Sequence, residues 1–287
     1  GRCVGSAGVQ KIAAALQDYY INAGYITTRI SIPSQDISKG KLRFQVNAGK
    51  IEKTIVEGND ISEWMLPFQR NDILNIRDIE QGLENLQRVP DVDVKINIEP
   101  GTRDGYSIVH IDTHRGKNWS VRASYNNWGD EETGRYQTTA VGYLFNPAKM
   151  GDLFYLAGTR STTGQYENVS SYYSIPVGYW EYGFFYSKSK SQQVIPLSYI
   201  SLDYVGTSEY LSAKATRTVY RDKTKKFAGS AELIRRKSNY TLNGEELTLQ
   251  ARDMGNIKLG LNYKQQLPGA FWDSTLSWQR FLTWFGG

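Results

Sequence analysis

His110 and His114, with Asp112 between them, are the residues whose types and spacing come nearest to a metal site. Two histidines four residues apart share one face of a helix and could hold a zinc ion. This stretch has the alternating pattern of a strand, however, and along a strand the three side chains would spread over about 13 Å. That is too far for one ion, so we expect no metal site here.

Other catalytic patterns are missing from the sequence. It contains no G-x-S-x-G elbow, no P-loop and no G-x-G-x-x-G, and its two histidines leave few ways to build a Ser-His-Asp site. The net charge of +5 comes from 34 basic and 29 acidic residues that are scattered along the chain, which is not the clustered pattern of a nucleic-acid surface. We expect a protein that is not an enzyme, needs no cofactor and binds no nucleic acid.

The single cysteine, Cys3, has no partner for a disulfide within the chain. The first eight residues lack the charged and then apolar pattern of a signal peptide, so we expect a processed or truncated N-terminus.

The elements that could position a site divide the chain into three parts. In the first, apolar residues recur every three or four positions over residues 9–23 and Gly24 follows, which predicts an amphipathic helix. Strands are expected over residues 25–32 and 42–46. The part is therefore an α-β-β unit.

Residues 50–113 read as β-α-α-β-β. Strands are predicted over residues 50–56, 92–98 and 106–113, with Val109 and Ile111 facing inward, and a short helix over residues 61–68. A second helix begins at the N-cap Asn75 and ends before Pro90. Gly82 inside it predicts close packing against the sheet. We expect a small α+β domain.

From residue 117 onward the helical signals vanish and about nine strands with period-two alternation follow. Aromatic residues make up 13% of the chain, yet its mean hydropathy is −0.50, and no run approaches the ~18 apolar residues of a membrane helix. We therefore predict strands of an outer-membrane barrel, with a soluble protein as the alternative. Short connections are expected near residues 146–150, 178, 222–226 and 267–269. Long connections are expected near residues 127–133, 161–168, 192–209 and 242–256.

Side-chain direction in these strands follows from the alternation. Trp272, Leu276 and Trp278 should face lipid, because the opposite register would place Asp273 in hydrocarbon. The residues predicted to face the lumen are Arg122, Lys258, Lys264 and Asp273, together with Thr275 and Ser277.

The sequence of residues 74–90, Leu-Asn-Ile-Arg-Asp-Ile-Glu-Gln-Gly-Leu-Glu-Asn-Leu-Gln-Arg-Val-Pro, resembles the second POTRA domain of two-partner secretion transporters. Segments 24–29, 35–37 and 49–52 resemble that family's first POTRA domain and the junction between the two. Segments 219–222 and 283–286 resemble its barrel. The resemblance implies POTRA domains followed by a transmembrane antiparallel β-barrel, with about nine of an expected sixteen strands present.

The resemblance also implies boundaries and a function. Residues 1–49 would be the C-terminal part of a first POTRA domain, 50–116 a second, and 117–287 the N-terminal part of the barrel. The protein would sit in the bacterial outer membrane with its POTRA domains in the periplasm, as a monomer in contact with lipid. It would capture the N-terminal secretion domain of a large exoprotein and export it through the lumen without nucleotide. Relative to the family, we expect the plug helix, the opening elements of the first POTRA domain and the barrel strands beyond Gly287 to be absent.

We expect the exoprotein to add a strand to the edge of the middle domain. The predicted cargo-binding residues lie on strand 92–98 and the groove beside the second helix, and they are Val92, Val94, Lys95, Ile96, Ile98, Arg77 and Gln81. Because inward and outward N–H groups alternate along an edge strand, we expect one of Val94 and Ile96 to face the open edge.

Two other functions remain open. An insertase of the same superfamily, which folds other outer-membrane proteins, usually carries more POTRA domains and lacks the helix sequence quoted above. A passive pore would have no use for residues 3–113, and an outer-membrane enzyme would need catalytic residues that the sequence lacks.

Overall fold

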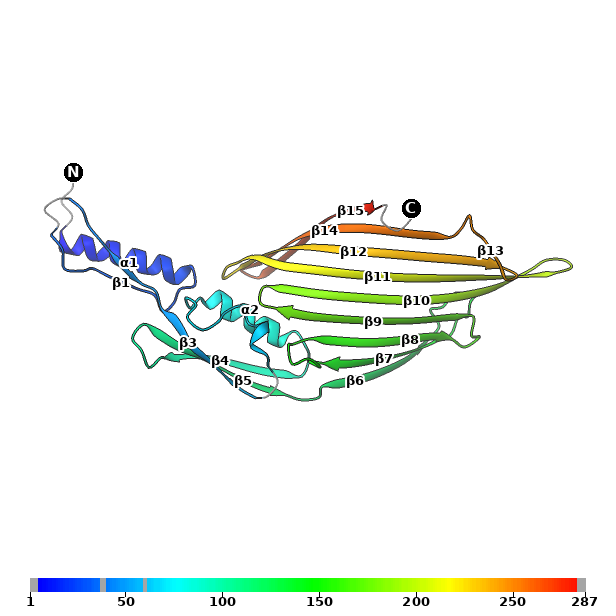
Figure 1. Ribbon diagram of the computed structural model, residues 1–287, viewed down its shortest axis with the longest axis horizontal. Coiled ribbons are helices and arrows are strands. Elements are labelled where there is room, and N and C mark those ends of the chain that lie inside the picture. The colour runs from blue at the N-terminus through cyan, green and yellow to red at the C-terminus, as the bar shows by residue number, and fades with distance from the viewer. Residues whose placement is uncertain (1–4, 37–39, 59–60, 283–287) are drawn as a thin grey trace.

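The computed structural model describes residues 5–36, 40–58 and 61–282. Cys3, Ile37 and segment 283–286 lie outside these residues, as does any prediction made for them. The molecule is elongated, with a helical unit at one end, a small mixed unit next to it, and a long sheet that fills the other half (Figure 1). Within the described ranges, no helix is long and apolar enough to cross a membrane.

The first unit consists of α1 (Ser6–Asn22), β1 (Arg29–Ser31) and β2 (Gln45–Asn47), and β1 pairs with β2 antiparallel. Gln17 attaches the helix to β1, because its Nε2 donates to the carbonyl of Thr28 at 2.6 Å and its Oε1 accepts from the amide of Ile30 at 2.9 Å. The helix and both strands were predicted. The first strand is much shorter than expected, since residues 25–28 form a turn after Gly24.

The second unit is α+β, as predicted. It contains β3 (Lys50–Glu57), the short 3-10 helix η1 (Glu63–Met65), α2 (Ile76–Gln87), β4 (Val92–Pro100) and β5 (Tyr106–Arg115). The sheet order is β3-β5-β4, with β3 parallel and β4 antiparallel to β5. Its core is formed by ten buried apolar residues: Ile51, Met65, Leu66, Phe68, Leu74, Ile79, Leu86, Val94, Val109 and Ile111.

Two local expectations for this unit need adjustment. The helix expected over residues 61–68 is reduced to η1, because the backbone is already extended at Leu66, before Pro67. A Cβ on Gly82 would lie 3.2 Å from both Leu66 and Phe68. The glycine is therefore a close-packing position, as expected, but its neighbour is the segment after η1 and not the sheet.

The long sheet confirms the predicted strand-rich, barrel-like half of the molecule. Nine strands follow one another as antiparallel neighbours, and the two-residue β13 (Glu245–Glu246) pairs beside them with β12. The nine are β6 (Trp119–Asn126), β7 (Gln137–Phe145), β8 (Leu153–Ser161), β9 (Tyr166–Val177), β10 (Trp180–Pro196), β11 (Ser201–Arg221), β12 (Lys225–Leu242), β14 (Arg252–Leu267) and β15 (Ala270–Leu282).

The short connections lie at the end of the sheet next to α2, as the sequence predicts (Figure 1). Two of the expected long connections are wrong, because residues 192–209 continue β10 and β11 around a turn at 197–200, and residues 162–165 form a tight turn. These strands extend beyond the segment in which one face is apolar. Their ends carry polar residues on both faces, so the sequence there has the pattern of a loop. The connection expected over residues 242–256 is long, although it is confined to residues 243–251 and includes β13.

Candidate functional site

β4 forms an open edge of the three-stranded sheet, as predicted for this strand. The opposite edge, β3, is partly occupied: the amide of Ile51 donates to the carbonyl of Asp72 at 2.9 Å, and the carbonyl of Ile51 accepts from Asn71 at 2.8 Å. Lys50 also forms a bridge with Ile73. Among the described residues, β4 is thus the edge with a full row of backbone groups available.

The backbone groups that β4 turns to its open edge are those of Val92, Val94, Ile96 and Ile98. The amide of Gly116 donates to Asp91 at 2.9 Å and the amide of Gly101 to Tyr106 at 2.8 Å, and both bonds extend the β4–β5 register by one pair. Hydrogen-bonded pairs alternate in an antiparallel ladder, so the odd-numbered residues of β4 bond to β5. Pro100 is even-numbered, so it lies at a position whose N–H would not bond to β5, and the absence of an N–H from proline costs the sheet no hydrogen bond.

The direction of these backbone groups corrects the expectation that only one of Val94 and Ile96 faces the open edge. The N–H groups of Val94 and Ile96 both face the open edge, because residues two apart on a strand point the same way. An N–H that faces the edge and one that bonds to β5 therefore belong to neighbouring residues, such as Ile96 and Lys95.

Partly buried apolar side chains lie on this strand and on α2, where the sequence predicts a groove. Five of these side chains are partly buried and pack on the core: Ile76 and Leu83 of α2, and Val92, Ile96 and Ile98 of β4. Val94 is 7% exposed and belongs to the core itself. Lys95 is exposed on the other face of the strand, which makes it a neighbour of the edge and not of the groove.

The placement of Arg77 and Gln81 in this groove was wrong. Both lie on the polar side of α2, opposite Ile79 and Leu86. Arg77 Nη1 donates to Glu80 Oε1 at 2.5 Å. Gln81 is 5% exposed, and its partners come from α2 and the long sheet.

The polar side of α2 docks on the turns of the long sheet and forms a contact that we call the junction. Arg221, at the end of β11, donates to Gln81 Oε1 at 3.0 Å and to Glu84 Oε2 at 2.5 Å. Lys226 of β12 pairs with the second oxygen of Glu84. Burial alone would raise the pKa of Glu84, but the bonds to Lys226 and Arg221 outweigh it and lower the pKa below its usual value.

A second set of bonds reaches β8 to β10. Arg88 contacts Glu181 Oε1 at 3.0 Å and Ser174 Oγ at 2.9 Å. Asn85 Nδ2 donates to the carbonyls of Met65 at 2.8 Å and Gly178 at 2.7 Å. These contacts satisfy polar side chains that are buried on the helix, so the junction fixes α2 to several turns at once.

Tyr179, in the turn between β9 and β10, completes the junction by donating its hydroxyl to Asp78. Burial raises the pKa of Asp78, although the bond from Tyr179 opposes the shift. Burial and the same bond also raise the pKa of Tyr179.

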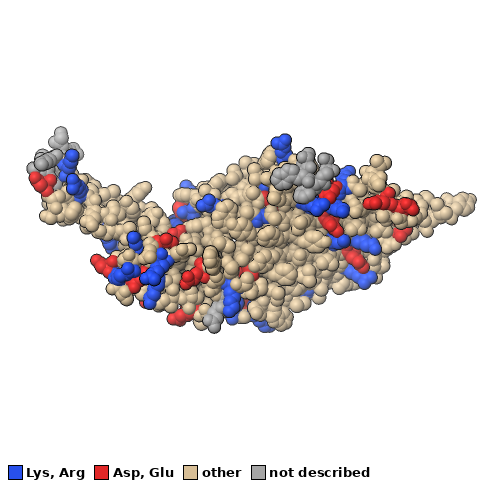
Figure 2. All heavy atoms as spheres, viewed as in Figure 1, with Lys and Arg blue, Asp and Glu red and all other residues tan. Residues whose placement is uncertain are grey.

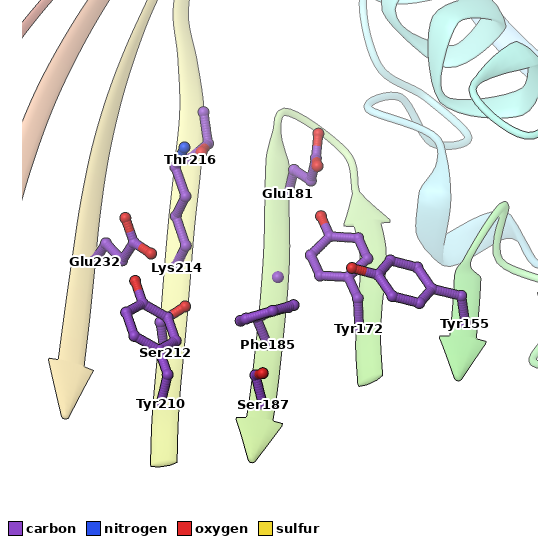
Figure 3. A pocket seen from close by; sticks show the side chains of 11 residues that line it. Tyr155, Tyr172, Glu181, Phe185, Ser187, Tyr210, Ser212, Lys214, Thr216 and Glu232 are labelled. Carbon is purple, nitrogen blue, oxygen red and sulfur yellow. The ribbon is translucent and has the colours of Figure 1, made fainter. Parts of the chain in front are cut away.

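The two faces of the long sheet differ in character. One face, which we call inward, lines a cavity of about 660 Å³ with side chains of β8 to β12, among them Tyr155, Tyr172, Phe185, Lys214 and Glu232 (Figure 3). Tyr155 and Tyr172 lie 5.6 Å apart between ring centroids. Polar and aromatic groups thus share this face.

The register of the strands places the predicted lumen residues on the inward face. Lys258 stands opposite Glu232, and Glu232 stands opposite Lys214. Lys264 and Asp273 face one another with Nζ and Oδ2 3.6 Å apart. Arg122 lies over the ring of Tyr143 at 5.5 Å, in line with Tyr155. Trp272, Leu276 and Trp278 lie on the outward face and are exposed.

The histidines do not form a site with a metal ion's geometry. His110 Nε2 lies 3.2 Å from Glu99 Oε2, and His114 is largely exposed near Asp112. Among the described residues there is no group of three potential ligands.

Sequence reasoning missed the junction. Gln81, Glu84, Asn85 and Arg88 recur at helical spacing on the side of α2 away from the apolar stripe. A solvated helix face has the same pattern, so the spacing alone could not reveal a partner. The resemblance of residues 219–222 to a barrel segment of the transporter family was the available signal, since this segment contains Arg221.

Comparisons with known proteins match all three parts of the chain. Residues 105–287 match the family model "Haemolysin secretion/activation protein ShlB/FhaC/HecB". Residues 47–100 match a POTRA domain model, and residues 1–49 match the ShlB-type POTRA domain model.

Individual proteins agree with these models. The chain is 30% identical to the outer membrane transporter CdiB of Dickeya dadantii over 99% of its own length and 52% of that protein. It superposes on CdiB from Escherichia coli with a TM-score of 0.89 at 27% identity, over 99% of this chain and 55% of the other. For CdiB from Acinetobacter baumannii the TM-score is 0.82 at 26% identity, over 98% and 55% of the chains. The chain spans about half the length of the curated relatives it matches.

Proposed function

The chain belongs to the haemolysin secretion/activation protein ShlB/FhaC/HecB family of two-partner secretion transporters, and we propose that it captures and exports a secreted exoprotein. It is an outer-membrane protein with its POTRA domains in the periplasm. We propose POTRA domains at residues 1–49 and 50–116 and the barrel portion at 117–287. The matched relatives are transporters by name, which supports a role without catalysis.

The observation that carries the proposal is the open edge of β4. Within the described part of the chain, its even-numbered residues present unpaired backbone groups, and partly buried apolar side chains of β4 and α2 lie beside them. An extended N-terminal secretion domain can add a strand there, gaining main-chain hydrogen bonds that tolerate many sequences. Side chains of alternate cargo residues would enter the groove between β4 and α2.

Transfer into the lumen follows from the junction. α2 is attached to the turns of β8 to β12, so cargo on the neighbouring β4 is held near the periplasmic mouth of the barrel. The inward face then offers Arg122, Lys214 and Lys258 between aromatic rings, and a polar wall of this kind contacts an unfolded chain without retaining it. Strand addition needs no nucleotide, and we propose that export proceeds without one, by a monomer.

The test compares proline at neighbouring positions of β4 in the full-length protein. Ile96→Pro removes an N–H that faces the open edge, whereas Lys95→Pro removes one that bonds to β5. We expect Ile96→Pro to weaken binding of the purified secretion domain by about tenfold, equivalent to ~1.4 kcal/mol, while β5 amides stay protected from hydrogen exchange. Lys95→Pro should lose that protection.

Ile96→Ala is the matched control, because it shortens the same side chain and keeps the N–H. It should bind more tightly than Ile96→Pro. Wild-type affinity in Ile96→Pro with β5 protected would mean that the cargo docks elsewhere.

A further inference from the structure

The outward face of the long sheet has a sharp boundary between uncharged and charged residues. From the periplasmic turns upward, the described outward positions of β6 to β15 hold two charged residues before that boundary, Arg217 and Lys225, and both lie near the periplasmic ends of their strands. Exposed apolar side chains fill the stretch, among them Val121, Leu144, Leu156, Val169, Phe184, Leu211, Leu233, Leu259, Leu261 and Leu276. This uncharged stretch is the surface that suits hydrocarbon.

Charged residues then follow on the same face in a continuous band. Six are basic and three acidic, and the nine are Arg160, Glu167, Lys188, Lys190, Glu209, Arg235, Lys237, Asp253 and Arg280. The band is net basic. On the side shown in Figure 2, charged atoms gather over the half of the long sheet away from α1, with a largely uncharged stretch before it.

The position of the band matches the end of a membrane span. Lys190, Arg235 and Arg280 each stand ten positions from the periplasmic end of their strand, at Trp180, Lys225 and Ala270 respectively. A tilted strand crosses the hydrocarbon in about 9–11 residues. Since the POTRA domains mark the periplasmic side, the band lies at the headgroups of the outer leaflet.

The band borders a hollow on the outward face. A depression of about 500 Å³ is lined by Ala140, Gly158 and Val169, with Arg160 and Glu167 at its rim. Lys190 stands opposite Glu167 and Lys188 opposite Val169 in the strand register. The floor contains small and apolar residues. Glu167 pairs with Arg160 at the rim, and with Lys188 and Lys190 beside it the rim is net basic, which is the form that a lipid with an anionic headgroup would fit.

Some of these cations have their charge already compensated, and others do not. Arg235 holds Asp253 with bonds of 3.0 and 2.7 Å, and Lys188 pairs with Glu209 at 2.8 Å. Arg160 pairs with Glu167 through its Nε, at 3.4 Å, and its side chain stays 70% exposed. Lys190 and Lys237 form no ion pair with any residue that the structure describes. The acidic residues thus order part of the band, while these two lysines keep their charge available for an anion.

We propose that the hollow and its basic rim bind a phosphorylated glycolipid of the outer leaflet, with its phosphate groups on Arg160 and Lys190 and acyl carbons over Gly158. Ammonium and guanidinium groups bind phosphate oxygens through charge-assisted hydrogen bonds, and each basic residue near an anionic membrane surface adds to the attraction. The proposal uses the outer-membrane location and no property of the cargo, so its failure would leave the transport proposal intact.

The experiment measures binding of bisphosphorylated lipid A to the full-length protein in detergent by native mass spectrometry. We expect Arg160→Gln/Lys190→Gln to weaken binding by about tenfold or more, from two lost charges at the headgroup level. The charge-matched control, Lys214→Gln/Lys258→Gln, removes two cations from the inward face and should bind like wild type. Heat-modifiable migration on gels verifies that each barrel is folded.

A second pair of variants tests the hollow without changing charge. Gly158→Leu fills it, and Gly142→Leu adds the same side chain at an outward position outside it; a Cβ at either glycine meets no atom within 4 Å. Gly158→Leu should reduce lipid A binding several-fold more than Gly142→Leu. Equal binding of dephosphorylated lipid A, or equal losses in variant and control of either pair, would overturn the proposal.

Discussion

Gln81 and Asn85 show how single residues connect the two halves of the molecule. Both are polar and nearly fully buried on α2, where an unsatisfied amide would cost about 1–3 kcal/mol. Asn85 donates to Gly178, and Gln81 accepts from Arg221, so the barrel turns supply the missing partners. Buried amides on this helix are therefore a consequence of the junction and would be unfavourable without it.

Leu86 illustrates the opposite, apolar side of α2. It is 1% exposed in a core with Val94 and Ile111. Leu86→Asp would bury a charge without a partner, at a cost of about 3–5 kcal/mol, and we expect it to unfold this unit and abolish secretion. Hydrogen exchange of β4 and β5 amides in the full-length protein measures the effect. Leu86→Met, which conserves volume, is the control, and full protection in Leu86→Asp would contradict the core assignment.

The elements were predictable where one periodicity extends over a long segment. The apolar stripe of α2, the N-cap Asn75, whose side chain accepts from Arg77 at 2.9 Å, and the order of the barrel strands all followed from the sequence. The lengths of β10 and β11 did not, because Lys188, Lys190 and Glu209 interrupt the apolar alternation on the outward face. Beyond the hydrocarbon a strand has no apolar face to mark it, and the pattern then resembles a loop.

The candidate site was predictable to a similar, partial extent. The edge position of β4 came from the resemblance to POTRA domains. The contacts of Asp78 and Gln81, by contrast, depend on tertiary neighbours more than 90 residues away in sequence, at Tyr179 and Arg221. No local pattern contains that information.

The faces of β15 give a prediction at this scale. The register places Leu276 outward opposite Leu261, and Thr275 inward opposite Asn262. Single cysteines at these positions, in a full-length protein with Cys3→Ser, should react oppositely in intact membranes. Leu276→Cys should favour a lipophilic maleimide and Thr275→Cys a water-soluble one, because one faces hydrocarbon and the other water. The reverse preference would require β15 to be shifted by one residue.

At the scale of the whole molecule, the junction determines where the edge of β4 lies relative to the barrel mouth. Its polar contacts come from three turns of the long sheet and the residues beside them. Gly151 approaches the helix so closely that a Cβ there would lie 2.6 Å from the carbonyl of Asn85. The contact is mostly polar, and partly exposed ion pairs contribute on the order of 0.5–1 kcal/mol each. Docking is therefore strong enough to orient the POTRA domain and weak enough to respond to the loss of one charge.

Glu84 predicts how that docking depends on pH. Its pKa is lowered below the usual 4.5 by Lys226 and Arg221, which outweigh the effect of burial, so the docked state favours the ionised form. The stabilisation is present above the undocked pKa and is lost as the pH falls through the docked pKa. Burial in the junction raises the pKa of Asp78, so the docked state favours its protonated form. Protonation of Asp78 therefore does not contribute to the loosening of the junction in acid.

We therefore expect Glu84→Gln to loosen the junction at neutral pH and to abolish the acid response. Spin labels at Lys95→Cys on β4 and Tyr199→Cys on the far turn, with Cys3→Ser, report the distance between the POTRA domain and the barrel. The wild-type distance distribution should be narrow at pH 7 and broaden as the pH falls through the lowered pKa of docked Glu84, where the carboxylate takes up a proton. Glu84→Gln should be broad both at pH 7 and in acid.

Glu52→Gln is the matched control for this experiment. The pKa of Glu52 is also lowered, chiefly by a hydrogen bond from Thr102, but its carboxylate binds the turn between β4 and β5 and not the barrel. This variant should keep the narrow distribution at pH 7 and still broaden in acid. If Glu84→Gln matched Glu52→Gln at neutral pH, the ion pairs with Arg221 and Lys226 would not be what holds the POTRA domain, and the buried amides of Gln81 and Asn85 would have to do so alone.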